Sequence, residues 1–230
     1  LRRVCGRFNI VQTPGLAALL EQLGVALDAP QPRYNVAPTE TVPLLRAGAL
    51  EPARWWLTPS WSDGPSQRYA MFNARSETLS RSRAFRVPFA RQRGVVPMSA
   101  FIEWRREGST RQPWRISNAP QALAIAALWD CWRDPSGEVL LSCTLVTTAA
   151  PESFRPWHDR VPVMLTLAEA RRWLDNDYRI APEDPLFAPV IKFPLRLAPV
   201  SRAVGNARNK RAEDQALTGE GVELSPQPPS

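Results

Sequence analysis

Val95-Val-Pro-Met-Ser-Ala-Phe-Ile-Glu-Trp104 is the stretch on which our interpretation of the fold depends. It is rich in β-branched and aromatic residues, which favour β-strands. Near its end the charged Glu103 stands between the apolar Ile102 and Trp104, and this alternation is typical of a strand that buries one face. The sequence therefore predicts a strand that carries a carboxylate at the border of the core.

Five further runs have the same strand-like character. Residues that favour turns separate them, as in Asp134-Pro-Ser-Gly137. Strands therefore dominate the predicted secondary structure. The runs are Thr41–Leu45, Arg54–Leu57, Ala122–Trp129, Val139–Thr148 and Val161–Leu165.

Two short amphipathic helices accompany these strands. Thr13-Pro14 places a capping residue before a proline at the first helical position, and leucines between Leu16 and Leu23 form one apolar stripe. Thr166 and Glu169 form a capping box that begins the second helix. Strands and helices together predict an α+β fold, with a curved, mainly antiparallel, barrel-like sheet and peripheral helices.

The length and composition indicate one domain. A chain of 230 residues with 44% hydrophobic content can bury a full core. We place the domain at residues 5–211. Residues 212–230 are polar and contain Gly, Ser and Pro, so we expect them to form a disordered tail.

Cysteine and histidine usage favours a reducing cytoplasm without a structural metal. Three cysteines cannot close a disulfide framework, and the single histidine leaves no zinc-ligand spacing, so we expect neither a metal nor a cofactor. The sequence has no run of about 18 apolar residues, and its beginning is too polar for a signal peptide. We therefore expect a cytoplasmic monomer that does not contact membranes.

The charge balance indicates nucleic acid as a partner. The chain has 29 basic and 22 acidic residues, and only Lys192 and Lys210 are lysines. Arginine makes bidentate contacts with phosphate, and the nine tryptophans suit stacking on unpaired bases. Genomic base composition and ordinary core packing are the alternative explanations of these counts.

The reactions that Cys5 can undergo depend on where the mature protein begins. If translation starts at Val4 through a GTG codon and the initiator is removed, Cys5 becomes the first residue and residues 1–4 are absent. A terminal cysteine carries a thiol and a free amine on adjacent carbons. The alternative is that residues 1–4 remain and Cys5 is an ordinary buried residue.

Six short strings, in this order along the chain, resemble those of the SRAP family of SOS-response-associated, abasic-site-processing proteins. The resemblance extends from Cys5 to about Lys210 and implies the SRAP fold. The strings are Cys5-Gly-Arg-Phe8, Arg33-Tyr-Asn-Val-Ala-Pro38, Asn73-Ala-Arg-Ser-Glu-Thr78, Phe101-Ile-Glu-Trp104, His158-Asp-Arg-Val-Pro-Val163 and Pro199-Val-Ser-Arg-Ala-Val-Gly-Asn206.

The resemblance implies roles for four catalytic residues. Cys5 would condense with the ring-opened aldehyde of an abasic site, and Glu103 would hold the α-amine and shuttle protons. His158 would protonate the sugar ring oxygen, and Asn73 would contact the abasic sugar. The alternative for Glu103 is an ordinary strand carboxylate that pairs with Arg105 or Arg106. The alternative for His158 is a structural role.

The resemblance also implies a surface that binds DNA. Arginines would contact the DNA backbone, and apolar residues would lie against the bases that flank the lesion. Surface arginines without any contact are the alternative, and Asn35 could instead brace the site or form a turn. The residues are Arg7, Asn35, Pro38, Trp61, Arg75 and Arg83.

Three functional hypotheses remain at this stage. The first is a protein that binds abasic sites in single-stranded DNA and forms a covalent thiazolidine crosslink through Cys5, acting at the nucleoid within the cytoplasm. A lyase that cleaves the strand through an imine is a variant of it. The second is a cysteine peptidase, limited in one form to removing residues 1–4. The third is a non-covalent module that binds single-stranded DNA.

Overall fold

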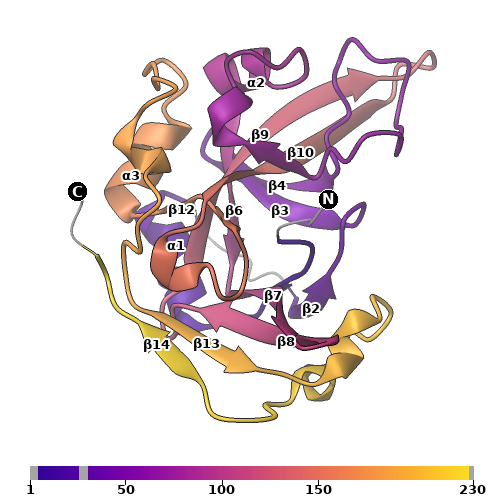
Figure 1. Ribbon diagram of the computed structural model, residues 1–230. Coiled ribbons are helices and arrows are strands. Elements are labelled where there is room, and N and C mark those ends of the chain that lie inside the picture. The colour runs from indigo at the N-terminus through magenta and orange to yellow at the C-terminus, as the bar shows by residue number, and fades with distance from the viewer. Residues whose placement is uncertain (1–4, 26–30, 228–230) are drawn as a thin grey trace.

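A closed barrel of five strands forms the larger part of the structure. The computed structural model describes residues 5–25 and 31–227 (Figure 1). Backbone pairing runs around the ring in the order β10-β4-β3-β6-β9 and returns to β10, and only β4 and β10 are parallel. The strands are β3 (Thr41–Arg46), β4 (Ala49–Trp55), β6 (Arg93–Met98), β9 (Leu123–Arg133) and β10 (Val139–Ala149).

Three short strands extend the barrel beyond the ring. Two of them pair with the second half of β10, and the third pairs with β9. They are β5 (Asn73–Arg75), β11 (Arg160–Pro162) and β12 (Met164–Leu165).

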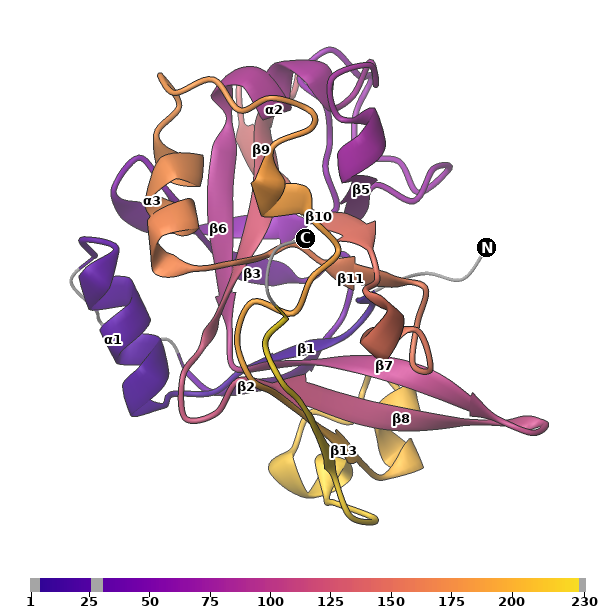
Figure 2. The same ribbon diagram turned by 60° about the vertical axis from the view of Figure 1, so that its left-hand side comes forward.

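A second, six-stranded sheet lies against the barrel, at the bottom of Figures 1 and 2. Its order is β14-β13-β8-β7-β1-β2, and every pairing in it is antiparallel. The two sheets confirm the α+β class and the mainly antiparallel, barrel-like core. The strands are β1 (Phe8–Ile10), β2 (Arg33–Val36), β7 (Ala100–Glu107), β8 (Thr110–Ser117), β13 (Leu195–Pro199) and β14 (Val222–Leu224).

The stretch from Val95 to Trp104 is two strands, where the sequence predicted one. Strand β6 belongs to the barrel and β7 to the second sheet. Between them, Ser99 forms hydrogen bonds with the backbone of the segment around β1. It donates to Asn9 O at 3.1 Å and accepts from Val11 N at 3.2 Å. Both halves are buried, so hydrophobicity alone did not reveal the change of sheet.

Both predicted helices are confirmed, including their caps. Thr13 accepts from Leu16 N, and the capping box of Thr166 and Glu169 is complete. A third helix, α2, lacks a side-chain cap and was not predicted. The helices are α1 (Pro14–Gln22), α2 (Arg86–Arg91) and α3 (Leu167–Leu174), with 3-10 turns η1 (Ser76–Thr78), η2 (Glu152–Phe154), η3 (Pro185–Phe187), η4 (Arg202–Gly205) and η5 (Ala212–Gln215).

The segment from residue 212 differs from the disordered tail that we expected, as far as residue 227. Strand β14 pairs with β13, and Gln215 is buried. Gly221 permits the close approach, because a Cβ there would lie 2.8 Å from Leu197 O. Main-chain hydrogen bonds hold this segment, and they require few large apolar side chains. Residues 1–4 and 228–230, for which we also stated an expectation, lie outside the described residues.

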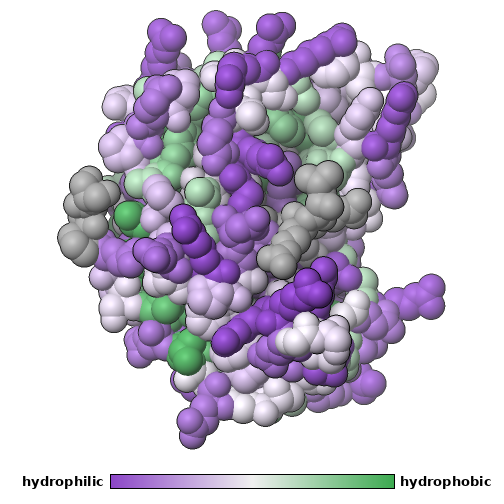
Figure 3. Space-filling model, viewed as in Figure 1, coloured by the Kyte–Doolittle hydropathy of each residue, from purple (hydrophilic) through white to green (hydrophobic). Residues whose placement is uncertain are grey.

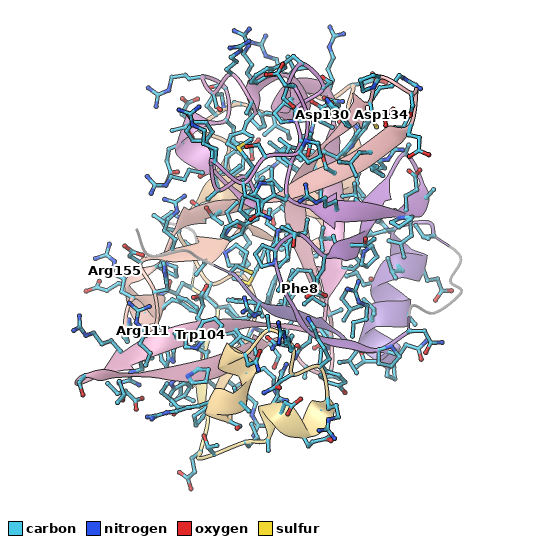
Figure 4. All side chains as sticks on the ribbon, turned by 90° about the vertical axis from the view of Figure 1, so that its right-hand side faces the viewer. Phe8, Trp104, Arg111, Asp130, Asp134 and Arg155 are labelled. Atoms are coloured by element: carbon cyan, nitrogen blue, oxygen red, sulfur yellow. The ribbon has the colours of Figure 1, made fainter. Side chains whose placement is uncertain are left out.

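The connection between β9 and β10 is the predicted turn. Asp134 accepts hydrogen bonds from Ser136 Oγ and Glu138 N, at 2.7 and 2.9 Å. Figure 4 shows Asp134 at the end of the molecule away from the β7–β8 hairpin. Within the described ranges, no helix has the length and apolar character needed to cross a membrane.

We expect Gly94→Ala to destabilise the barrel by about 1–3 kcal/mol, because the added carbon overpacks it. The Cβ would lie 2.8 Å from Leu44 Cδ1 and 2.9 Å from the backbone oxygen of Leu45. Urea unfolding followed by tryptophan fluorescence measures the change. Gly205→Ala is the control, since its Cβ would have no neighbour within 4 Å. Equal stability of the two variants would contradict this account.

Candidate active site

The start of β1 places Cys5 beside Glu103 of β7. Phe8 pairs with Phe101, and Ile102 N donates to Arg7 O at 2.9 Å, which holds the two segments antiparallel. Cys5 N then donates to Glu103 Oε1 at 2.6 Å. Cys5 is 0% exposed and Glu103 is 1% exposed, so this contact is shielded from water.

The buried position of Glu103 changes its protonation. Burial raises the pKa of Glu103 from its ordinary value of 4.5 to about 8, and Asp159 adds to the rise, while the Cys5 N–H opposes it. Burial, assisted by Glu103, also holds the pKa of the Cys5 thiol well above its ordinary value. The site therefore contains a neutral carboxylic acid and a neutral thiol at pH 7.

His158 follows η2 and is buried. Its Nδ1 accepts a hydrogen bond from Arg160 N at 3.0 Å, so the neutral ring carries its proton on Nε2. Asp159 Oδ1 also lies 2.9 Å from Nδ1. One nitrogen cannot accept and donate at once, so the Asp159 contact belongs to a ring that carries a proton on Nδ1.

Glu103 and His158 line one cleft of about 100 Å³, although 54 residues lie between them in the sequence. Trp104 and Arg111 of the β7–β8 hairpin also line it. Figure 4 shows Trp104, Arg111 and Arg155 near one another at this end of the molecule. The tertiary structure thus joins an acid and an imidazole at a hollow with arginines around it.

Strand β10 brings the other predicted residues toward this cleft. On one edge Asn73 and Arg75 pair with Leu145 and Thr147, and on the other edge β11 follows His158. Arg160 joins the two sides, because it binds both carboxylate oxygens of Glu77 at 2.9 Å and donates to Thr147 O at 2.8 Å. The sequence analysis did not single out Arg160, although it lies in the His158 string.

Trp61 and Arg83 lie together on the surface. The Arg83 guanidinium carbon is 4.0 Å from the centre of the Trp61 ring, and Trp61 is 51% exposed. Both line a hollow of about 640 Å³, which also contains Tyr69 at 65% exposure. Exposed rings that are held in place by a cation offer a surface for flat ligands.

Arg7 and Pro38 are half-buried. Arg7 donates to the backbone oxygen of Gly6 at 2.9 Å. Burial lowers the pKa of Arg7, and Glu40 opposes that shift. Arg7 thus lies in the segment that leads directly from Cys5 into β1.

The surroundings of Asn35 favour a structural role over contact with DNA. It is fully buried and has φ 52°, in the left-handed region. Its Nδ2 donates to the carbonyls of Val204, Asn206 and Asn209 at 3.0, 2.9 and 3.0 Å. These bonds tie Asn35 to the loop after β13 and support the bracing role, which is one of the alternatives that the sequence leaves open.

The fold and the site together define a known class of protein. Residues 4–207 match the family described as SOS response associated peptidase (SRAP), and the chain belongs to this family. This membership confirms the resemblance drawn from the six strings.

Named relatives and a solved structure agree with this membership. The abasic site processing protein YoqW of Bacillus subtilis (strain 168) is 35% identical over 190 residues, covering 76% of this chain and 84% of that protein. YedK of Escherichia coli (strain K12), also named an abasic site processing protein, is 34% identical, covering 91% and 98%. A crystal structure from Bacteroides thetaiotaomicron shares the fold, with a TM-score of 0.77, 21% identity, and coverage of 90% and 97%.

We expect Asn35→Ala to destabilise the protein by about 1–3 kcal/mol, because three backbone carbonyls lose a buried donor. Chemical denaturation measures the change. Asn35→Gly is the informative companion, since glycine adopts φ 52° without strain and should lose less stability than alanine. A fully stable Asn35→Ala variant would show that the loop does not depend on this side chain.

We also expect a pH dependence that comes from Glu103. Because folding raises its pKa, the folded state holds a proton that the unfolded state releases between pH 4.5 and about 8. Stability should therefore fall as pH rises through this window, with a slope approaching about 1.4 kcal/mol per pH unit. Urea unfolding at several pH values in this window, with the chain of residues 1–230, measures the change in stability. The Glu103→Gln variant should lack the pH-dependent part. If the stability of the variant and of the wild type changed with pH in parallel, the assignment to Glu103 would be refuted.

Proposed function

We propose that this protein processes abasic sites in single-stranded DNA by forming a covalent thiazolidine through Cys5. The observation that carries the proposal is the 2.6 Å contact between the Cys5 nitrogen and the buried Glu103 carboxyl group. The family membership and the names of the relatives support the substrate class. The proposal requires Cys5 to be the first residue of the active protein.

The chemistry follows from the two groups of a terminal cysteine. The amine adds to the aldehyde of the ring-opened site, and the resulting carbinolamine loses hydroxide, which leaves as water, to give an imine. The Cys5 thiol then adds to the imine carbon, and its proton goes to the imine nitrogen. The product is a five-membered ring, and the net change is the loss of one water. Redox chemistry has no part in these steps.

Glu103 is suited to move the protons. An α-amine has an ordinary pKa of about 7.7–8.0, close to the raised pKa of about 8 for Glu103. Proton transfer between the two groups therefore costs little in either direction. The ionised fraction of Glu103 can accept the ammonium proton to free the nucleophile, and the neutral acid formed in this way can then protonate the carbinolamine hydroxyl as it leaves.

His158 is suited to open the sugar. Its Nδ1 accepts from Arg160 N, which leaves the proton of the neutral ring on Nε2. When the ring is doubly protonated, its Nε2 proton can pass to the sugar ring oxygen, which breaks the bond to C1 and leaves a neutral imidazole, while the C1 hydroxyl proton passes to water. The aldehyde forms in the same step, and Asp159 Oδ1 would stabilise a doubly protonated ring.

Two exposed parts of the molecule fit an unpaired strand. Arg75 is exposed beside Asn73, and Trp61 with Arg83 presents a stacking surface. Base stacking on aromatic rings and phosphate contacts with arginines are the usual means of binding single strands. Arg7 lies two residues after Cys5, and Pro38 follows β2, which pairs with β1, so both remain proposed contacts with the strand.

Self-processing is a second candidate, because Glu103 contacts the nitrogen that cleavage before Cys5 would release. The Cys5 thiol would attack the preceding carbonyl carbon, and its proton would pass to the solvent. A proton from Glu103 would pass to the leaving nitrogen, and water would then hydrolyse the thioester. The product would be the free terminal cysteine that the first proposal requires.

Intact mass spectrometry tests the proposal. Two forms are compared, the chain of residues 1–230 and a chain that begins at Cys5, before and after incubation with an abasic single-stranded oligonucleotide. We expect the Cys5 form to gain the mass of the oligonucleotide less one water. Cys5→Ala keeps the amine and should form only an adduct that borohydride traps. Glu103→Gln should react about 10²–10⁴-fold more slowly.

Each alternative has its own outcome in this experiment. If the chain of residues 1–230 loses residues 1–4 without any protease, self-processing is favoured. Equal affinity for intact and abasic strands, with no adduct, would favour a non-covalent module and overturn the proposal. A borohydride-trapped adduct followed by strand cleavage would indicate the lyase variant. An undiminished denaturant-resistant adduct in Cys5→Ala would exclude Cys5 as the reacting residue.

A further inference from the structure

We propose that an arginine-lined basin beside α2 binds the phosphates of the DNA strand beyond the lesion. The inference extends the proposed function, on which it rests, to a second site on the same molecule. The basin is the hollow of about 670 Å³ between α2 and residues 176–182. Figure 2 shows the connection that follows α3 lying next to α2, at the top of the molecule.

Arginines dominate the walls of the basin. Arg86 and Arg91 come from α2, Arg93 from β6, and Arg179 from the connection after α3. Asp177 is the one acidic residue among the described residues that line it. A guanidinium group forms planar, paired hydrogen bonds with phosphate, so this set of side chains suits a polyanion.

Three of these arginines have charge that is available to a ligand. Arg86, Arg91 and Arg179 are exposed. Within residues 5–25 and 31–227, no carboxylate forms an ion pair with any of them. Other arginines of the structure are paired, as Arg160 is with Glu77 and Arg172 with Asp184. The basin therefore concentrates positive charge that the fold itself does not use.

Arg93 adds a buried positive charge beneath the basin. It is 1% exposed and donates its hydrogen bonds to backbone carbonyls, and the charge of Asp175 acts on it without an ion pair between them in the described part of the chain. Carbonyl dipoles satisfy the hydrogen bonds of a guanidinium group but leave its net charge in place. The positive potential of the basin thus has a fixed component. The acceptors are the backbone oxygens of Trp173, Phe89, Ala90, Asp175 and Tyr178.

The chain between the lesion site and the basin is itself basic. From Asn73 to Arg93 it contains six arginines and a single acidic residue, Glu77, which is bound by Arg160. The exposed Arg75, Arg81, Arg83 and Arg86 follow one another along it. Figure 3 shows hydrophilic side chains that project along the top of the molecule, where α2 lies.

Residues 80–86 separate two hollows of different character. Ser82, Arg83 and Ala84 line the hollow that contains Trp61 and Tyr69, whereas Ser80 and Arg86 line the basin. A single strand has bases on one side and phosphates on the other. A strand that follows this segment can therefore place bases against the exposed aromatic rings and phosphates in the basin.

The test measures binding of unmodified single strands of about 5 and about 25 nucleotides over a range of salt concentrations. The variant is Arg91→Glu with Arg179→Glu. Its control is Arg171→Glu with Arg196→Glu, two exposed arginines that change the net charge equally. The crosslinking rate with the short abasic strand is measured in parallel, in chains that begin at Cys5.

We expect the basin variant to bind the long strand about tenfold more weakly, and its salt slope to fall by about 1–2, as the loss of two phosphate contacts predicts. Its crosslinking rate with the short strand should match that of the wild type. Equal weakening in the control variant, or an unchanged affinity in the basin variant, would overturn the proposal. If the wild-type protein binds long strands through the basin but never crosslinks, the proposed function is refuted and the basin proposal stands.

Discussion

Strand β10 is the element on which both the barrel and the site depend. Its first half pairs with β9 and β4 and closes the ring, and its second half pairs with β5 and β11. The strand thereby fixes Asn73 and Arg75 on one edge and the segment after His158 on the other. Its backbone groups are satisfied on both sides, so the flanking segments have little freedom to shift. A rigid barrel thus positions groups that lie far apart in the sequence.

The second determinant of the site is the burial of Glu103. A carboxyl group on an exposed strand would be ionised at neutral pH and solvated. Here β1 and β7 enclose it against Cys5, and the loss of hydration raises its pKa to about 8. This position suits proton transfer because the raised pKa of Glu103 lies close to the ordinary pKa of an α-amine. The same burial keeps the Cys5 thiol protonated until an electrophile reaches it.

Local patterns predicted the elements that are stabilised locally. Thr13 and Thr166 cap the helices as expected, since a cap involves residues only three positions apart. The alternation around Glu103 also placed this residue at the border of the core. Some strands were missed because they have only three or four residues, and others because polar residues and a proline interrupt their apolar pattern. The short ones are β1, β2, β5 and β14, and the interrupted ones are β8 and β13. Pairing with neighbouring strands stabilises them, and that pairing depends on segments far away in the chain.

The sequence by itself determined the α+β class, the family resemblance and the identity of the residues that could react, because these are carried by short strings and periodic patterns. Tertiary structure decided which of these residues meet. It buried Asn35 under three carbonyls and brought Glu103 and His158 to one cleft. It also placed Arg179 opposite α2. The physical reason is that burial, pKa and charge density depend on neighbours in space, which strand pairing sets and local sequence does not encode.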